Sequence, residues 1–88
     1  MDVIRTYDEE DGWVEYMEQD GKVYMSAHTP LKRYPKRMMI NIARTFLTFP
    51  EVYTILPYEY LVKFYDKHTN LELIDSNTHL YRVYGRKK

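Results

Sequence analysis

A helical pattern between two prolines is the feature that most restricts how this chain can fold. Four apolar residues of the segment 35–49 have the i, i+3, i+4, i+7 spacing that places side chains on one helix face: Met39, Ile42, Ala43 and Phe46. Pro35 suits a first helical turn, and Pro50 disfavours helical geometry at the residue before it. One amphipathic helix cannot bury its own apolar face, so the flanking segments must supply a surface that covers it.

Basic residues gather around the start of this predicted helix. They are Lys32, Arg33, Lys36 and Arg37, and Arg44 extends the basic stripe along the helix. Cations are unfavourable at the N-terminal end of a helix, where the dipole favours acids. We therefore expect these residues to bind a partner, either a phosphate group or an acidic protein surface. The alternative is a solvated loop whose charge is balanced by acids from residues 1–20.

The dipeptide Asp20-Gly21 predicts a β-hairpin between residues 13–19 and 22–28. Asp-Gly favours a type I′ turn, because that turn needs a positive φ at both central residues. Pairing across the turn sets three pairs of residues opposite one another: Glu18 and Val23, Tyr16 and Met25, and Val14 and Ala27. Residues directly opposite in an antiparallel pair share a face, so the register predicts which side chains meet the helix.

The two faces of the predicted hairpin differ in character. One face is apolar and is expected to pack on the helix: Val14, Tyr16, Val23, Met25 and Ala27. The other face is mixed, and its apolar part is Trp13, Met17 and Tyr24. If no second element covers this mixed face, it is a contact site for a partner; if one does, it is ordinary core. We favour the contact site.

The C-terminal half is predicted as a three-stranded antiparallel meander, because its apolar and aromatic residues alternate. Its strands are expected at residues 58–66, 71–75 and 79–84, with 51–57 as a short strand or turn before them. The expected fold is therefore α+β: an antiparallel sheet, made of the N-terminal hairpin and this meander, packed against one amphipathic helix. The 88 residues are expected to form one small globular domain.

The formal net charge is zero, but the charge is distributed unevenly along the chain. Residues 1–20 contain eight acids and one base, and residues 21–50 contain six bases and no acid. Four acids follow one another in a predicted turn and form a candidate acidic surface: Asp8, Glu9, Glu10 and Asp11. Either the two charged blocks face each other within the fold, or they meet a charged partner, and the sequence leaves both open. If the acidic block meets a basic partner, one form of that contact is imitation of a nucleic-acid backbone by the acidic segment.

The motifs of common enzymes are missing from the sequence. The chain has no cysteine, no Gly-rich phosphate loop, no G-x-S-x-G and no H-E-x-x-H. Its three histidines lie in separate segments and do not define a metal site. We expect no enzyme activity, no cofactor and no bound metal. The lack of cysteine, of a long apolar run and of a signal-peptide pattern indicates a cytoplasmic protein that does not bind membranes.

Ten tyrosines in 88 residues favour a recognition surface, since tyrosine is enriched in protein interfaces. A sheet whose faces are half buried would also explain them. We expect a small protein-binding module, an inhibitor or adaptor that covers a partner's surface. A compact, cysteine-free chain without enzyme motifs would also suit a viral or mobile-element protein directed at a host protein.

Two alternatives come from other functional classes. In a nucleic-acid binder, the basic residues would meet phosphates and several tyrosines would stack on bases: Tyr58, Tyr60, Tyr65, Tyr81 and Tyr84. This requires the basic groups and the tyrosines to share one face, clear of the acidic segment. The other alternative is a structural homo-oligomer joined through a sheet edge or the tyrosine-rich face.

Overall fold

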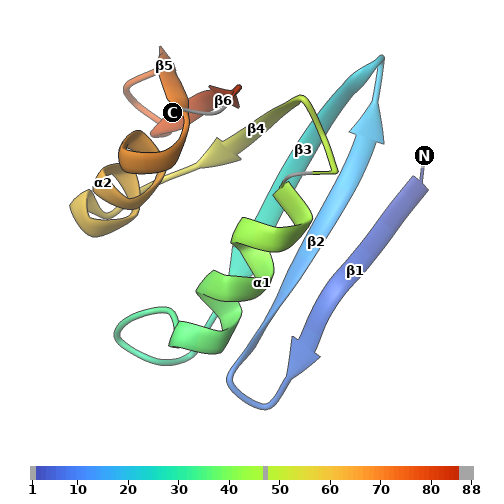
Figure 1. The fold of residues 1–88 in the computed structure, drawn as a ribbon, viewed down its shortest axis with the longest axis vertical. Coiled ribbons are helices and arrows are strands. Elements are labelled where there is room, and N and C mark those ends of the chain that lie inside the picture. Colours follow the sequence, from blue (N-terminus) through green and yellow to red (C-terminus); the bar gives the residue numbers. More distant parts are fainter. Residues whose placement is uncertain (1, 47, 86–88) are drawn as a thin grey trace.

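The computed structural model describes residues 2–46 and 48–85, without the side chains of Asp2 and Phe46. Within these ranges, six strands form one sheet and two helices pack against it (Figure 1). The elements in chain order are β1 (Asp2–Glu9), β2 (Gly12–Gln19), β3 (Lys22–His28), α1 (Lys36–Phe46), β4 (Glu51–Ile55), α2 (Glu59–His68), β5 (Asn70–Asp75) and β6 (Leu80–Tyr84). The fold class is α+β, as predicted.

The sheet is mixed and has the strand order β1-β2-β3-β4-β6-β5. Neighbouring strands run antiparallel except β3 and β4, which run parallel. α1 connects these two strands, and such a crossover returns the chain to the same end of the sheet before the next strand begins. The prediction of a wholly antiparallel sheet is therefore wrong at this step. Hydrophobic alternation specifies which face a side chain takes, but it does not specify the direction in which distant strands pair.

The N-terminal hairpin is confirmed in each of its predicted pairs. β2 and β3 place Glu18 opposite Val23, Tyr16 opposite Met25, and Val14 opposite Ala27. Asp20 and Gly21 have φ values of 54° and 78°, the two positive values that a type I′ turn requires. β1 adds a strand on the other side of β2, with an irregular step in register between Arg5 and Tyr7.

Residues 58–66 contribute to the second helix, α2, and do not form the predicted strand. The N–H of Leu61 donates to the carbonyl of Tyr58 at 3.1 Å, and the N–H of Thr69 donates to that of Tyr65 at 2.8 Å, which marks the two ends of the helix. Leu61 and Tyr65, four residues apart, are the buried side chains of α2. The segment fits both a two-residue alternation and a helical period, and burial of these two residues in the core decides for the helix.

Three strands form the C-terminal part of the sheet. The segment 51–57, expected as a short strand or turn, contains β4, which pairs with β6 along its whole length. β5 and β6 confirm the strands predicted at residues 71–75 and 79–84, with small differences at their ends. β4 therefore takes the place in this three-stranded unit that the prediction gave to residues 58–66.

α1 is confirmed as an amphipathic helix, but its buried face is rotated from the predicted one. Met38 and Ile42 are buried, Met39 is partly buried, and Ala43 is exposed. The predicted contact of Phe46 lies outside the described side chains. The face that meets the sheet therefore includes Ile42, as predicted, and Met38, which was not predicted, whereas Ala43 lies outside it.

Hydrogen bonds to the sheet explain this rotation of α1. The Asn41 amide donates to the backbone oxygen of Thr6 at 2.9 Å. The hydroxyl groups of Thr45 and Tyr16 share a hydrogen bond of 2.7 Å. Because these polar partners lie in β1 and β2, Asn41 and Thr45 turn toward the sheet and Ala43 turns away from it.

The hydrophobic core lies between the sheet and both helices. Its buried apolar residues are Val14, Tyr16, Met25, Met38, Ile42, Val52, Leu56, Leu61, Tyr65 and Val83. Both helices contribute to this one cluster, so they cover the same face of the sheet. Burial raises the pKa of Tyr16 to about 12 and raises the pKa of Tyr65 well above its usual value. Among the described side chains, no buried nitrogen or oxygen atom lacks a hydrogen-bond partner.

Candidate functional site

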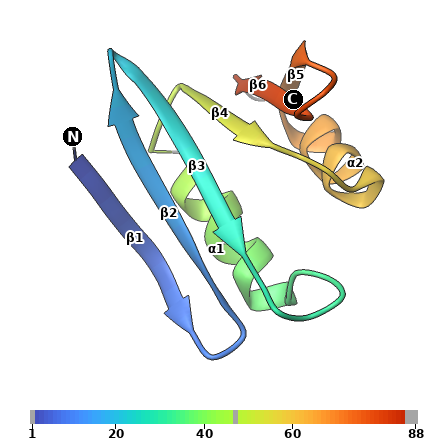
Figure 2. The same cartoon turned by 180° about the vertical axis from the view of Figure 1, so that it is seen from behind.

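One face of the sheet carries no helix in the part of the chain that the structure describes. Both helices pack on the opposite face, and Figure 2 shows β2 and β3 from the uncovered side with α1 behind them. We call this uncovered side the open face. It is formed chiefly by Arg5, Trp13, Glu15, Met17, Lys22, Tyr24, Tyr53, Arg82 and Tyr84. The three predicted contact residues Trp13, Met17 and Tyr24 thus share one surface, and it is not core.

The aromatic rings of the open face lie beside cations. Three such pairs are Arg5 with Trp13 at 5.2 Å, Lys22 with Tyr53 at 5.3 Å and Arg82 with Tyr84 at 4.0 Å, measured to the ring centroid. The rings of Tyr24 and Tyr53, from neighbouring strands, have centroids 5.6 Å apart. A cation over an aromatic face is attracted by the ring quadrupole, so these contacts restrain both partners.

Two arginines of the open face each lie between two carboxylates. Arg5 forms ion pairs with Asp8 and Glu15, and Arg82 forms ion pairs with Glu51 and Glu72. The hydrogen bond from Arg82 holds the pKa of Glu51 below its usual value. Positive and negative groups therefore alternate across the open face, and neither sign dominates it.

A hollow of about 190 Å³ opens on this face beside Met17 and Tyr24. Tyr53, Ile55 and Leu80 also line it. The hollow lies where β3 and β4 meet, and their parallel contact consists of two residue pairs. Walls that combine aromatic and aliphatic side chains are suited to receive an apolar side chain of a partner protein.

Tyr53 and Arg82 were not predicted as contact residues. Tyr53 lies on β4, whose pairing with β3 of the N-terminal hairpin is not visible in the sequence, and Arg82 lies on β6, which joins the sheet through β4. Tyr53 did have a signal, because it lies in the segment 51–57 that was expected as a short strand or turn, and a strand directs successive side chains to opposite faces. Arg82 had the same kind of signal, because it lies within the strand predicted at residues 79–84.

The predicted basic residues lie in three different settings. Lys32, Arg33 and Lys36, between β3 and the first turn of α1, are exposed and form no ion pair with any carboxylate of the described residues. We call these three residues the basic loop. Arg44 is exposed in the last turn of α1, about 12 Å further along the helix axis, so the structure separates it from the basic loop.

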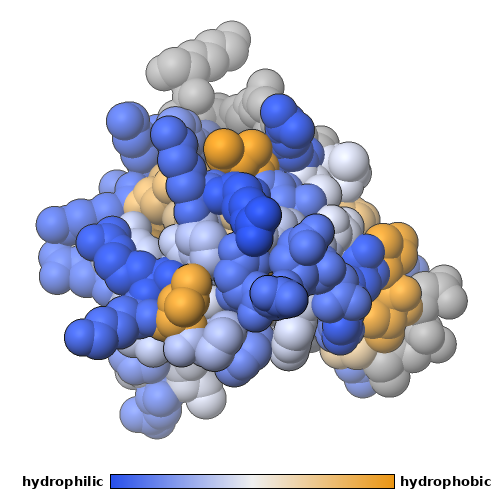
Figure 3. Space-filling model, turned by 90° about the horizontal axis from the view of Figure 1, so that it is seen from below, coloured by the Kyte–Doolittle hydropathy of each residue, from blue (hydrophilic) through white to orange (hydrophobic). Residues whose placement is uncertain are grey.

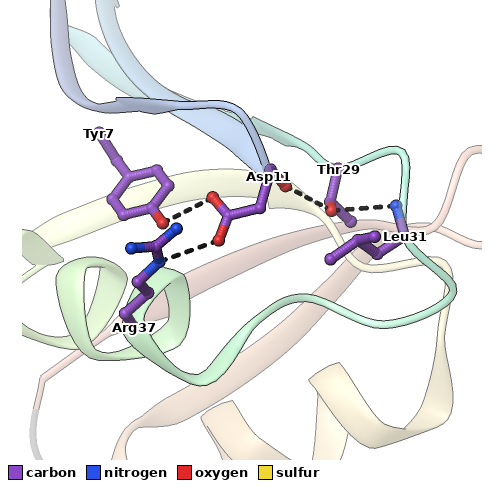
Figure 4. Close-up of polar contacts among 5 residues, drawn as sticks. All are labelled: Tyr7, Asp11, Thr29, Leu31 and Arg37. Carbon is purple, nitrogen blue, oxygen red and sulfur yellow. Dashed lines mark hydrogen bonds and ion pairs between the residues drawn. The ribbon is translucent and has the colours of Figure 1, made fainter.

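Arg37 is bound within the chain to Asp11, as Figure 4 shows. Its Nε donates to Oδ2 of Asp11 at 2.9 Å, and the Tyr7 hydroxyl donates to Oδ1 at 2.7 Å. The hydrogen bonds from Tyr7 and Arg37 hold the pKa of Asp11 below its usual value. The Thr29 hydroxyl donates to the backbone oxygen of Asp11 at 2.6 Å. Asp11 therefore connects the β1–β2 turn both to the first turn of α1, through Arg37, and to the segment before α1, through Thr29.

The four residues of the predicted acidic surface have different roles. Asp11 is held by Arg37, and Asp8 forms an exposed ion pair with Arg5 at 3.4 Å. Glu9 and Glu10 are exposed and form no ion pair within residues 2–46 and 48–85. Among the described residues, the contact of Asp11 with Arg37 is the ion pair that joins the acidic block to the basic block. The two blocks thus neutralise each other at one point, and most of their charge faces solvent.

The five tyrosines grouped above for base stacking do not share a face. Tyr65 is buried, Tyr81 packs against the core, and Tyr84 lies on the open face. Tyr58 and Tyr60 stand together at the start of α2, where their ring centroids are 5.9 Å apart. Because α2 is a helix, alternate residues of this segment do not point the same way.

The described residues also lack the features of some other functional classes. They contain no group of three or more His, Asp or Glu side chains placed to hold a metal ion. They contain no helix whose length and apolar character would let it cross a membrane. No known protein family, curated protein sequence or solved structure matches the chain. The candidate site is therefore defined by its physical features: an open face with aromatic rings and paired charges, and a basic loop at one end.

Proposed function

We propose that this chain is a small, non-enzymatic protein-binding module, an inhibitor or adaptor that covers a partner's surface with its open face. The observation that carries the proposal is the group of four rings on a sheet face without a described helix over it: Trp13, Tyr24, Tyr53 and Tyr84. Aromatic residues, Met and Arg are enriched at the centres of protein interfaces. The cations beside these rings limit their motion, and an ordered surface loses less entropy when it binds.

The charge of the open face favours a protein partner over a nucleic acid. Arg5 and Arg82 are each shared by two carboxylates, so a polyanion would meet negative groups beside both of these cations. Nucleic-acid domains usually present an excess of positive charge, which neutralises phosphates. An alternating pattern instead suits a partner surface that carries both signs.

Two alternatives rest on other features of the molecule. Nucleic-acid binding is supported by the basic loop and by exposed Tyr58. A homo-oligomer is supported by exposed apolar residues on the two edge strands, Val3 and Ile4 on β1 and Leu73 and Ile74 on β5. A cytoplasmic location and a viral or mobile-element origin are parts of the proposal that rest on composition alone.

Site-specific photo-cross-linking in the source cell tests the proposal. The variant Tyr24→benzoylphenylalanine places the reactive group on the open face, and we expect it to capture a protein of defined mass. The matched control is Ile40→benzoylphenylalanine, at an exposed position on the side of α1 that faces away from the sheet. A product from position 24 without an equal product from position 40 supports the open face as the interface.

A second substitution makes this result specific. Met17→Glu places a charge in the hollow beside Tyr24, and we expect it to remove the cross-link while far-UV circular dichroism stays unchanged. A cross-link from position 24 that persists in the Met17→Glu variant contradicts the proposal. A product of twice the chain mass would favour the homo-oligomer. Saturable, salt-sensitive quenching of Trp13 by single-stranded DNA or RNA, without a cross-linked protein, would favour nucleic-acid binding.

A further inference from the structure

A second hollow adjoins the open face, between the end of β3 and the start of α2. Its volume is about 270 Å³, and five of the residues that line it are His28, Lys32, Tyr34, Tyr58 and Tyr60. We call it the tyrosine hollow. The ring of His28 lies 5.8 Å from the ring of Trp13, so this hollow is continuous with the aromatic residues of the open face.

The walls of the tyrosine hollow are held by contacts among themselves. The N–H of Tyr34 donates to the Tyr60 hydroxyl at 3.0 Å, and the Tyr34 hydroxyl donates to the carbonyl of Ala27 at 3.3 Å. The rings of Tyr58 and Tyr60 are nearly parallel, with an angle of 14° between their planes. The guanidinium of Arg33 lies 4.2 Å from the centroid of Tyr60. A hollow with ordered walls loses less entropy when a ligand enters it.

Unpaired positive charge borders this hollow. Lys32 lines it directly, and Arg33 covers one of its tyrosines. The first turn of α1 contains no acid, although the helix dipole favours acids there. Asp11, the acid that contacts this segment, is already held by Arg37. The basic loop is therefore complementary to a negatively charged ligand from outside the chain.

We infer that the tyrosine hollow and the basic loop bind a short acidic peptide segment of the partner protein. An apolar or aromatic side chain of the peptide occupies the hollow, and its carboxylates meet Lys32, Arg33 and Lys36. The inference rests on the proposed protein-binding function and names the chemistry of the partner at one end of the interface. It assigns a role to the three exposed cations of the basic loop, which are not part of the open face.

The acidic β1–β2 turn favours a short peptide over a nucleic acid at this hollow. Thr29 lines the hollow and also donates to Asp11 in that turn, so the turn is in contact with the wall of the site. Glu9, at the end of β1, and Glu10, in the turn, are both exposed. Figure 3 views the molecule from this end and shows a largely hydrophilic surface with separate hydrophobic spots. A nucleic acid carries charge along its whole length and would be repelled by Glu9 and Glu10, whereas a short acidic segment can end before them.

Tyr60 offers a second reason against base stacking. Its ring is already in contact with Arg33 and with the ring of Tyr58. Single-strand binders need an accessible aromatic face for each base that they stack. The occupied ring of Tyr60 contributes a wall to the hollow and leaves Tyr58 as the more accessible of the two.

Selection from a random dodecapeptide library displayed on phage tests the inference with the full chain as the target. Peptides are selected on the wild-type chain alone, and the selected peptides are then measured against the double variant Lys32→Glu/Arg33→Glu. We expect enrichment of Asp and Glu around an aromatic or aliphatic residue. The best peptide, labelled with fluorescein, should bind the double variant about tenfold or more weakly, as reversal of two charge contacts predicts.

A matched control separates local from general electrostatic effects. Lys63→Glu/Lys67→Glu makes the same charge change at exposed positions of α2 and should leave peptide affinity unchanged. Far-UV circular dichroism verifies that both double variants fold. Equal weakening by both double variants, or enrichment of peptides without acidic residues, overturns the inference. Displacement of the peptide by oligo-dT at lower concentration than by unlabelled peptide also overturns it, in favour of nucleic-acid binding.

The outcomes also distinguish this inference from the proposed function. Peptides that lose affinity with Met17→Glu but not with Lys32→Glu/Arg33→Glu would overturn the tyrosine hollow as the site and support the open face. Failure to enrich any peptide would overturn the inference alone, because cross-linking from position 24 tests the open face independently. Loss of both results would overturn both.

Discussion

Tyrosine serves opposite purposes on the two faces of this sheet. On the covered face, Tyr16 and Tyr65 are buried, and their hydroxyls lie against Thr45 and the sulfur of Met25. On the open face, tyrosine rings lie beside cations and remain partly accessible. The same side chain therefore provides core volume where a helix covers the sheet and contact area where none does. The difference lies in what packs above each face, so substitutions on the two faces should have different effects.

The largest expected difference is in stability. Tyr65→Ala leaves a cavity in the core and should lower the free energy of unfolding by about 3–5 kcal/mol. That is a large share of the stability of a domain this size, about 5–10 kcal/mol. Tyr24→Ala, on the open face, should cost less than about 1 kcal/mol. Urea unfolding followed by circular dichroism measures both, and equal losses would contradict the assignment of the two faces.

A second difference should emerge at alkaline pH. Burial raises the pKa of Tyr16 to about 12, so the folded chain keeps this hydroxyl neutral where the unfolded chain ionises it, above its ordinary pKa of 10.0. The stability that Tyr16 contributes is therefore present below about pH 10 and is lost as the pH rises toward 12. Tyr16→Phe removes this dependence, along with the hydrogen bond to Thr45.

Unfolding midpoints in urea, compared at about pH 8 and about pH 11, check this expectation. Tyr16→Phe should be less stable than the wild-type chain at the lower pH, by about 1 kcal/mol for the lost hydrogen bond. It should then lose less stability than the wild type between the two pH values. Tyr24→Phe, on the open face, is the matched control and should follow the wild-type curve. A Tyr16→Phe curve parallel to that of the wild type would show that Tyr16 ionises as freely in the fold as outside it.

A smaller effect is expected where the β1–β2 turn joins the first turn of α1 through the contact of Asp11 with Arg37. The pKa of Asp11 is held below its usual value by hydrogen bonds from Tyr7 and Arg37, so Asp11 stabilises the fold when ionised. This contribution is present above its unfolded pKa and is lost as the pH falls below about 4. Asp11→Asn should therefore lose less stability than the wild type on acidification. Glu10→Gln, an exposed acid of the same turn, is the control, and an identical response from both variants would contradict the role of Asp11.

The smallest effect on stability is expected for Arg5→Gln on the open face. Exposed ion pairs contribute little, so its unfolding curve should match the wild type within experimental error. The Trp13 ring lies beside this guanidinium, and its fluorescence should change in intensity or wavelength when the charge is removed. A variant that unfolds more readily but keeps the wild-type emission would show that Arg5 supports the fold and does not order the ring.

The part of the candidate site that was predictable lies within one hairpin. Trp13, Met17 and Tyr24 could be placed on a common face because the Asp20-Gly21 turn sets the register locally. Tyr53 joins them through the parallel contact of β3 with β4, and this contact connects strands separated by the whole of α1. The basic loop was visible as a run of charge, but its position beside the tyrosine hollow depends on α2, which was predicted as a strand.

By itself, the sequence determined the hairpin and its register, the presence of α1, and the strands β5 and β6. These features depend on turn conformations and on periodic patterns among residues close together in the chain, which act before any distant contact forms. Only the tertiary structure decided the parallel pairing of β3 with β4 and the helical form of residues 58–66. The sequence of that segment fits both the two-residue alternation of a strand and a helical period. Burial of Leu61 and Tyr65 against the sheet favours the helix. Which tyrosines became core and which became surface followed from the same packing.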